Sequence, residues 1–297
     1  YGEGGNDTLV HSGSGTQYYD GGEGVDTYEL ALQSWTTIPD GFVGEVNFKT
    51  NFSGAFYNHD HESNDQVYNM ENITLFGNAD YVMIGDDNDN VIVTDGGDDK
   101  IYGGEGNDIL KSGSGDDKIY GEGGNDTLVM NGSGTQLFNG GDGNDTIRLD
   151  LSNWSLNLNQ DYDQIIEVNL LAETSGQKGN PSLRDRLVGI ENIEFIGSYD
   201  TELIGDNNDN IIIGGDGTDT ITTGLGSDVI VIRAGDGSSS LETTDRITDF
   251  EDGFDLIGMA GVNFSYFSKD QGTGSNAAHT ILSISGEYVT ILENTTV

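Results

Sequence analysis

The chain has 297 residues, including 46 glycines, 11 basic and 52 acidic residues, and a formal net charge of −41. This charge excludes nucleic acid and anionic membranes as partners, because both bind through basic surfaces, and it favours bound cations that relieve repulsion among the carboxylates. The sequence contains no cysteine, which excludes disulfides, and no apolar run long enough to span a membrane.

The beginning of the chain is expected to lie inside a longer protein. Tyr1 takes the ninth position of a nine-residue repeat whose earlier part is missing. The first residues also lack the basic flank and apolar stretch of a secretory signal. We therefore expect neighbouring domains of a longer parent chain.

A nine-residue pattern, GGxGxDxUx with an apolar residue at U, recurs in segments 1–29, 85–148 and 205–231. Five copies adjoin one another directly and begin at Gly85, Thr94, Gly103, Ser112 and Gly121. Such a fixed period indicates a β-helix, because a phased acidic and a phased aliphatic residue make each copy one structural unit. Glycines permit the positive φ of a tight turn, and xUx predicts a short strand whose middle side chain points inward. Two copies complete one coil, so turns eighteen residues apart should stack.

The inward positions predict narrow ladders of aliphatic side chains. They are Ile92, Ile101, Leu110, Ile119, Leu128, Ile147, Ile212, Ile221 and Ile230. One such side chain in nine residues cannot offset the backbone entropy lost on folding, so we expect the chain to be largely unfolded without metal.

The segments between the repeats are expected to be β-rich inserts. Segments 30–84 and 149–204 contain short apolar stretches typical of strands. The chain consists of two similar units, because YGEGGNDTLV opens at Tyr1 and recurs at Tyr120, and NMENITLFG of the first insert aligns with GIENIEFIG of the second. Segment 232–297 pairs strands with acidic turns and should cap the last coil. The sequence thus predicts an all-β chain of β-roll (solenoid) segments, β-rich inserts and a C-terminal β cap.

The stacked turns predict calcium binding. Ca²⁺ takes six to eight hard oxygens, and aspartates together with backbone carbonyls supply that mixture. A solvated acidic linker would have no reason to keep a nine-residue phase across three segments.

The repeats resemble those of the RTX (repeats-in-toxin) family of secreted bacterial proteins, and DRITDF in the closing segment resembles the sequence after the last roll in that family. The resemblance implies right-handed parallel β-rolls that fold on calcium after type I secretion. It also implies that carbonyls at positions two and four and the aspartate at six share an ion with positions one, three and six two turns later.

Carried over to this sequence, the resemblance implies ligands in every roll. In the first roll they are Glu3, Gly5, Asp7, Gly21, Glu23 and Asp26. In the central roll they are Asp86, Asn88, Asn90, Asp95, Gly97, Asp99, Gly103, Gly104, Glu105, Gly106, Asp108, Ser112, Gly113, Ser114, Gly115, Asp117, Gly121, Glu122, Gly123, Gly124, Asp126, Gly140, Asp142 and Asp145. Those of the last roll and its continuation are Asp206, Asn208, Asn210, Gly215, Gly217, Asp219, Thr223, Leu225, Asp228 and Asp245.

Four turns depart from the pattern at the aspartate position. Asn90 and Asn210 offer an oxygen without a charge, whereas Gln17 and Gln136 follow the inserted residues His11 and Met130. We expect missing or weaker ions at the glutamine turns. The sequence also predicts that Tyr19 and Phe138 point into the roll.

The favoured function is a calcium-dependent structural or spacer module, monomeric and without catalysis, in an extracellular type I-secreted bacterial protein such as an adhesin or toxin. A carbohydrate-binding module of a polysaccharide-modifying enzyme is the alternative. Its aromatic candidates are Trp35, Tyr57, Trp154 and Tyr162. An enzyme would have to use the zinc-like cluster His59, Asp60 and His61 with Asp65, which has no third histidine nearby. A surface loop is the simpler interpretation of that cluster.

Overall fold

The computed structural model describes residues 1–11, 17–31, 42–57, 60–61, 65–152, 165–180, 184–233, 236–261 and 267–295. These residues form β-strands and two short 3-10 turns, η2 (Leu241–Thr243) and η4 (Gly274–Asn276), with no α-helix among them. The all-β prediction is confirmed. None of the described segments is a helix with the length and apolar character needed to cross a membrane.

The described chain divides into two compact units. Unit 1 comprises Tyr1–Ile147 with Val188–Ile190, and unit 2 comprises Arg148–Leu187 with Glu191–Val297. Two strands, β16 (Thr146–Asp150) and β19 (Arg184–Val188), carry residues of both units.

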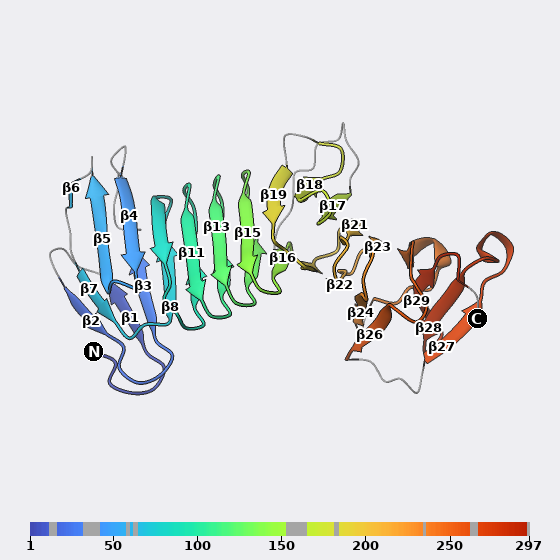
Figure 1. Ribbon diagram of the computed structural model, residues 1–297, viewed down its shortest axis with the longest axis horizontal. Coiled ribbons are helices and arrows are strands. Elements are labelled where there is room, and N and C mark those ends of the chain that lie inside the picture. The colour runs from blue at the N-terminus through green and yellow to red at the C-terminus, as the bar shows by residue number, and fades with distance from the viewer. Residues whose placement is uncertain are drawn as a thin grey trace. The chain divides into compact units, whose positions relative to one another are not determined.

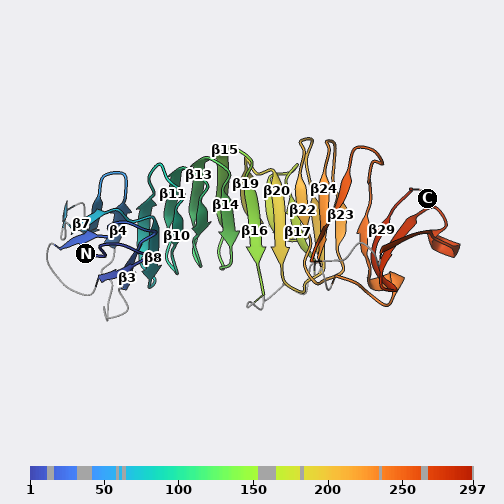
Figure 2. The ribbon, with the colours of Figure 1, turned by 90° about the horizontal axis from the view of Figure 1, so that it is seen from below.

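Unit 1 contains two ladders of parallel strands, which alternate along the chain (Figure 1). Strands of the first ladder are β1 (Thr8–His11), β3 (Thr27–Ala31), β8 (Asn72–Phe76), β10 (Val91–Val93), β12 (Ile109–Lys111) and β14 (Thr127–Met130). Strands of the second are β9 (Asp80–Ile84), β11 (Lys100–Glu105), β13 (Lys118–Gly123) and β15 (Leu137–Asp142). Figure 2 shows β8, β10 and β14 of the first ladder from another side.

The strand register has the period that the repeats predict. Ile92 pairs with Leu110, and Leu110 pairs with Leu128, in steps of two nonapeptides. On the other ladder Ile101 pairs with Ile119, which pairs in turn with Phe138. Each nonapeptide therefore contributes one strand, and two complete a coil.

An antiparallel hairpin adjoins the second ladder of unit 1. Its strands are β4 (Phe42–Asn47) and β5 (Phe52–Tyr57). Strand β4 pairs in parallel with β9, while β5 is antiparallel to β6 (Asp60–His61) and β7 (Asp65–Tyr68). Strand β7 in turn pairs in parallel with β2 (Tyr18–Asp20).

Unit 2 repeats the parallel arrangement. One ladder consists of β20 (Asn192–Ile196), β22 (Ile211–Ile213), β24 (Val229–Arg233) and β26 (Leu256–Ala260). The other consists of β17 (Ile166–Asn169), β21 (Thr201–Ile204), β23 (Thr220–Thr222), β25 (Asp245–Ile247) and β29 (Glu287–Leu292). Antiparallel pairing adds β18 (Thr174–Gln177) to β17, and β28 (Thr280–Ile284) with β27 (Phe267–Gln271) to β29.

The parallel ladders include strands that have no recognisable nonapeptide in the sequence. Ile73 of β8 and Met83 of β9 are fully buried beside the inward residues of the neighbouring coils. Glu71, just before β8, and Tyr81, within β9, stand where the repeat has aspartate, so the motif is hidden there although the coil continues. In unit 2, β25 and β26 extend both ladders past residue 231.

The predicted inward ladder is confirmed, since every one of its side chains is at most 3% exposed. Phe138 and Tyr19 are 0% and 8% exposed, so both point into the roll as predicted. Because each of the strands β10, β11, β12 and β13 contributes a single inward apolar side chain, the core of these coils is narrow.

Leu110→Ala should lower the free energy of unfolding by about 2–5 kcal/mol, because it leaves a cavity in this one-residue-wide core. Ile109→Ala, at the adjacent position that is 41% exposed, should change it by less than about 1 kcal/mol. Urea unfolding of both variants in saturating calcium measures the difference. Equal losses would contradict the inward assignment of Leu110.

Candidate calcium-binding turns

Many of the turns that join the strands have positive φ angles at the second and fourth positions of the nonapeptide. Gly104 and Gly106 have φ of 113° and 107°, and Gly113 and Gly115 have 77° and 151°. Only glycine adopts these angles without a steric cost, which explains the spacing of glycines in the repeat. Glu122, with φ of 78°, is a non-glycine residue that takes this conformation.

The aspartates at the sixth position are buried and held by the preceding coil. Asp108, Asp117 and Asp126 are each 1% exposed. The backbone N–H of Asp99 donates to Oδ1 of Asp117 at 2.9 Å, and that of Asp108 donates to Oδ1 of Asp126 at 2.8 Å. One oxygen of each carboxylate is thereby fixed in the stack of turns.

The other oxygen of each carboxylate is buried without a hydrogen-bond partner. It is Oδ2 of Asp7, Asp26, Asp99, Asp108, Asp117, Asp126, Asp145, Asp219 and Asp228. A buried polar atom left unpaired costs about 1–3 kcal/mol, and more when it is charged. A cation in contact with these oxygens would remove that cost, so the residues present fit a metal ion.

Each unpaired oxygen lies in a small space lined by backbone. A Cβ on Gly121 would be 2.1 Å from Oδ2 of Asp126 and 2.4 Å from the carbonyl oxygen of Gly140. A Cβ on Gly103 would be 2.2 Å from Oδ2 of Asp108 and 2.7 Å from the carbonyl oxygen of Gly121. The glycine at the first position thus makes room for a carboxylate oxygen beside a carbonyl oxygen of the next coil.

The donor set suits calcium. Within the described ranges no group of three or more His, Cys, Asp or Glu side chains gathers around one point. Carbonyl oxygens must therefore supply much of any coordination, and a mixture of carboxylates and carbonyls is what hard cations such as Ca²⁺ take. When bound, the ion would supply positive charge to the buried carboxylates and nothing else.

Burial raises the pKa of these carboxyl groups. The pKa of Asp99 rises to about 7, mainly through desolvation, and the charge of Asp117 adds to the effect. Desolvation likewise raises the pKa of Asp108 to about 7 and that of Asp219 to about 6. The pKa of Asp245 rises to about 8, through desolvation and then the charge of Asp219. Without a cation, these groups hold protons near neutral pH.

The structure brings together the turns that the sequence pairs. Ser114 N–H donates to the Asp95 carbonyl oxygen at 2.7 Å, and Gly97 N–H to that of Ser114 at 3.1 Å. Gly104 pairs with Glu122, and Glu105 with Gly123, in the register of β11 and β13.

The first roll keeps the same register in spite of its inserted residue. Gly5 N–H donates to the Glu23 carbonyl oxygen at 2.7 Å, and Asp7 N–H to Oδ1 of Asp26 at 2.8 Å.

The turns of unit 2 make the same contacts. Asp219 N–H donates to Oδ1 of Asp245, and Asp228 N–H to Oδ1 of Asp255. The ligand role of the individual residues remains a prediction.

Sequence reasoning missed a second ladder at the fifth position. There Asp or Asn side chains accept the N–H of the fifth residue in the next coil, as Asp98 does from Asp116 at 3.0 Å and Asp89 from Asn107 at 2.7 Å. The signal was present, because the fifth position is Asp or Asn in each of the five adjoining repeats. Glu71 was also missed: its Oε2 accepts the N–H of Asp26 at 2.7 Å.

Several residues singled out for other functions lie outside the described residues. These are Trp35, Trp154, Tyr162 and His59, and the side chains of Tyr57, Asp60, His61 and Asp65 are not described either.

Comparison with known proteins identifies the repeats. Four copies of the RTX calcium-binding nonapeptide repeat match residues 84–117, 105–129, 130–153 and 195–230. No curated protein sequence matches the chain. Among solved structures, the extracellular lipase LipA from Serratia marcescens aligns at 13% identity and a TM-score of 0.25. The alignment covers 79% of this chain and 42% of the lipase, so this chain spans less than half of that protein.

Asp117→Asn should weaken calcium binding by about tenfold, equivalent to about 1.4 kcal/mol. The amide keeps an oxygen for the N–H of Asp99 but removes the buried negative charge. Asp116→Asn is the matched control, since Asp116 is exposed and its Oδ1 accepts the N–H of Thr135. Calcium titrations followed by calorimetry compare the two, and similar affinities would contradict the site.

Calcium binding should release more protons at about pH 6 than at about pH 9, because the buried aspartates must lose protons to bind the ion. In the calcium-free fold the raised pKa values mean that the folded state keeps protons which the unfolded chain loses near pH 4. The stability of that fold therefore falls as the pH rises from about 4 to about 7. Calorimetry in buffers of different ionisation enthalpy counts the protons; the same release at both pH values would contradict the assignment.

Proposed function

Since the chain belongs to the RTX calcium-binding repeat family, we propose that it is a calcium-dependent folding and spacer module of a larger secreted bacterial protein. In this proposal it works outside the cell, as a monomer between neighbouring domains, after type I secretion. An adhesin or a toxin is the kind of parent protein that such a module suits.

The observation that carries the proposal is the column of buried carboxylates whose Oδ2 atoms have no protein partner. A stack of such groups is unfavourable by itself, because each buried charge pays for desolvation without a counter-charge. Calcium reverses the balance. The ion thus acts as a structural component, and the narrow core needs it.

Calcium concentration would then act as a folding switch. Extracellular modules bind calcium at about 10⁻⁴–10⁻³ M, far above its free concentration in the cytosol. Binding that stabilises only the folded state shifts the folding equilibrium in proportion to ligand concentration. The chain would remain unfolded in the cytosol, where export requires it, and would fold outside.

We assign the module no catalytic role. The family match describes a calcium-binding repeat, and the chemistry of the turns is that of metal binding. Its acidic surface opposes binding to nucleic acid.

The carbohydrate-binding alternative has one described feature in its favour. Tyr102 and Tyr120 stack with ring centroids 5.0 Å apart, on strands that also carry the exposed Lys100 and Lys118. The faces of these rings are turned toward each other, which leaves little ring surface for a sugar. We therefore place the spacer function first.

The far-UV circular dichroism spectrum should change from a disordered form in EGTA to a β-sheet form when millimolar calcium is restored. The expectation follows from the unpaired buried carboxylates, because burying them in their charged form is unfavourable without a cation. Magnesium at the same concentration is the control, because its strict octahedral geometry suits carbonyl-rich turns poorly. A β-sheet spectrum and an unchanged melting temperature in EGTA would refute the proposal.

A further inference from the structure

Four turns carry an amide at the sixth position, and in three of them the amide donates to a backbone carbonyl of the preceding coil. Asn90 Nδ2 donates to the Glu71 carbonyl oxygen at 3.0 Å, and Asn210 Nδ2 to that of Glu191 at 2.7 Å. Gln136 Nε2 donates to the Gly113 carbonyl oxygen at 3.1 Å. All three amides are buried, with exposures of 1%, 1% and 2%.

The amide turns differ from the aspartate turns in how their buried atoms are satisfied. Among the described side chains, nine aspartates at this position have a buried Oδ2 without a hydrogen-bond partner, whereas no atom of Asn90, Asn210 or Gln136 is buried without a partner. In these amide turns an N–H donor contacts a carbonyl oxygen of the preceding coil, a contact that a carboxylate cannot make. The same backbone stack is therefore closed in two chemically different ways.

We infer that the gap between each of these three amide-bearing turns and the coil before it is closed by the amide and holds no calcium. This inference rests on the proposed calcium-dependent function. It adds which turns interrupt the series of calcium sites along the roll. The amide nitrogen presents hydrogens where an ion would need an oxygen, and it already uses a carbonyl that would otherwise be a ligand.

The turn of Gln136 is the most informative case, because its backbone stacks like that of a calcium turn. Thr135 N–H donates to Oδ1 of Asp116 at 2.8 Å, and Leu137 N–H to the Asp117 carbonyl oxygen at 2.9 Å. The equivalent bonds in the coil before join Asp116 N–H to Asp98 and Lys118 N–H to Asp99. The side chain at one position, and not a change of backbone register, distinguishes this turn.

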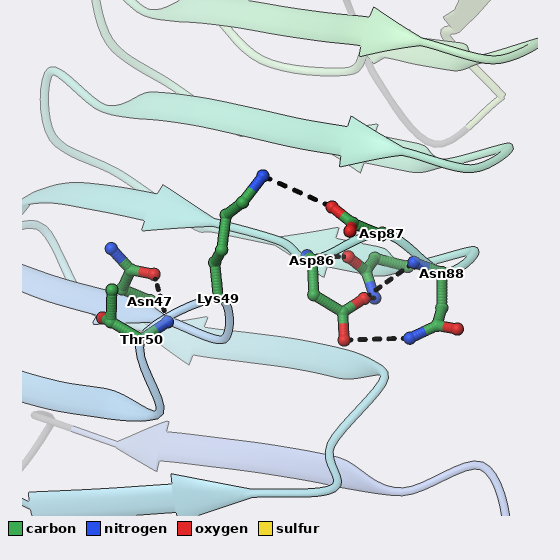
Figure 3. Close-up of polar contacts among 7 residues, drawn as sticks. Asn47, Lys49, Thr50, Asp86, Asp87 and Asn88 are labelled. Carbon is green, nitrogen blue, oxygen red and sulfur yellow. Dashed lines mark hydrogen bonds and ion pairs between the residues drawn. The ribbon is translucent and has the colours of Figure 1, made fainter.

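The asparagine turns are also saturated by their own hydrogen bonds. Asn88 donates its backbone N–H to Oδ1 of Asp86 at 2.9 Å and its side-chain Nδ2 to Oδ2 at 3.0 Å, as Figure 3 shows. Oδ1 of Asp86 also accepts from Asn90 Nδ2 at 3.3 Å. The turn of Asp206, Asn208 and Asn210 repeats these contacts. Both turns stand at the start of a repeat run, so each amide closes its column on the side of the preceding coil.

A neighbouring segment adds a cation of its own to the first of these turns. Lys49 Nζ lies 3.3 Å from Oδ1 of Asp87, which Figure 3 also shows. Both side chains are largely exposed, so the pair contributes little to stability.

The test is the number of calcium ions bound by the whole chain, measured by native mass spectrometry at saturating calcium. Gln136→Glu keeps the shape of the side chain but replaces the N–H donor with a carboxylate oxygen, so it should bind one calcium ion more than the natural chain. Thr135→Glu adds the same charge at the adjacent exposed position and should leave the number unchanged.

A second measurement decides the matter if Gln136→Glu does not fold. Crystals of the natural chain grown in calcium should show anomalous peaks beside Oδ2 of Asp108 and Asp126 and none between Gly113 and Gln136. A peak in that gap, or a folded Gln136→Glu variant with no additional ion, would overturn the inference. If the natural chain folds and binds no calcium anywhere, the proposed function itself fails, which is a different result.

Discussion

Compensation of buried negative charge is the constraint on which the rest of this structure depends. Each aspartate at the sixth position has one oxygen fixed by a backbone N–H of the preceding coil and one oxygen facing a space lined by carbonyls, as Asp126 does beneath Gly121. A carboxylate in that position must hold either a proton or a cation. The pKa of about 7 for Asp99 and Asp108 reflects the first choice, and calcium provides the second. The net charge of −41 over the whole chain makes the second choice the more important one.

Glycine spacing and the hydrophobic core both follow from this constraint. Where the first position is glycine, as at Gly103 and Gly121, a carboxylate oxygen occupies the space of its Cβ, and in these two turns the second and fourth positions have positive φ. Only three residues per nonapeptide remain for a strand, and only the middle one, such as Ile101 or Leu110, can point inward. Under the proposed function, a core of this width needs ions bound in the turns to stabilise the coil.

The amide turns show that the backbone of the roll does not by itself determine where ions bind. Gln136 stands on a turn stacked in the register of its neighbours, yet its Nε2 makes a hydrogen bond where those neighbours leave an oxygen unpaired. Asn90 and Asn210 also donate an amide hydrogen to a carbonyl of the preceding coil, while their Oδ1 atoms accept the N–H groups of Asp86 and Asp206. An amide nitrogen in this position needs a carbonyl oxygen as its partner, whereas a carboxylate oxygen in the same position needs a cation. If the inference holds, the roll contains turns closed by an amide hydrogen bond beside turns closed by a calcium ion.

The sequence by itself determined the nine-residue unit, the inward side chains and the pairing of turns eighteen residues apart, because all three follow from a local period that every copy repeats. It also determined that Phe138 replaces an aliphatic residue inside the roll. Tertiary structure alone decided that Ile73 and Met83 continue the ladders, since Glu71 and Tyr81 stand where the motif requires aspartate. It also decided that Asp245 takes the next place after Asp219, 26 residues away instead of eighteen. The strands of these coils are positioned by hydrogen bonds to the neighbouring strands of each ladder. Such pairing does not require a repeated motif, so the sequence shows no nine-residue period at these places.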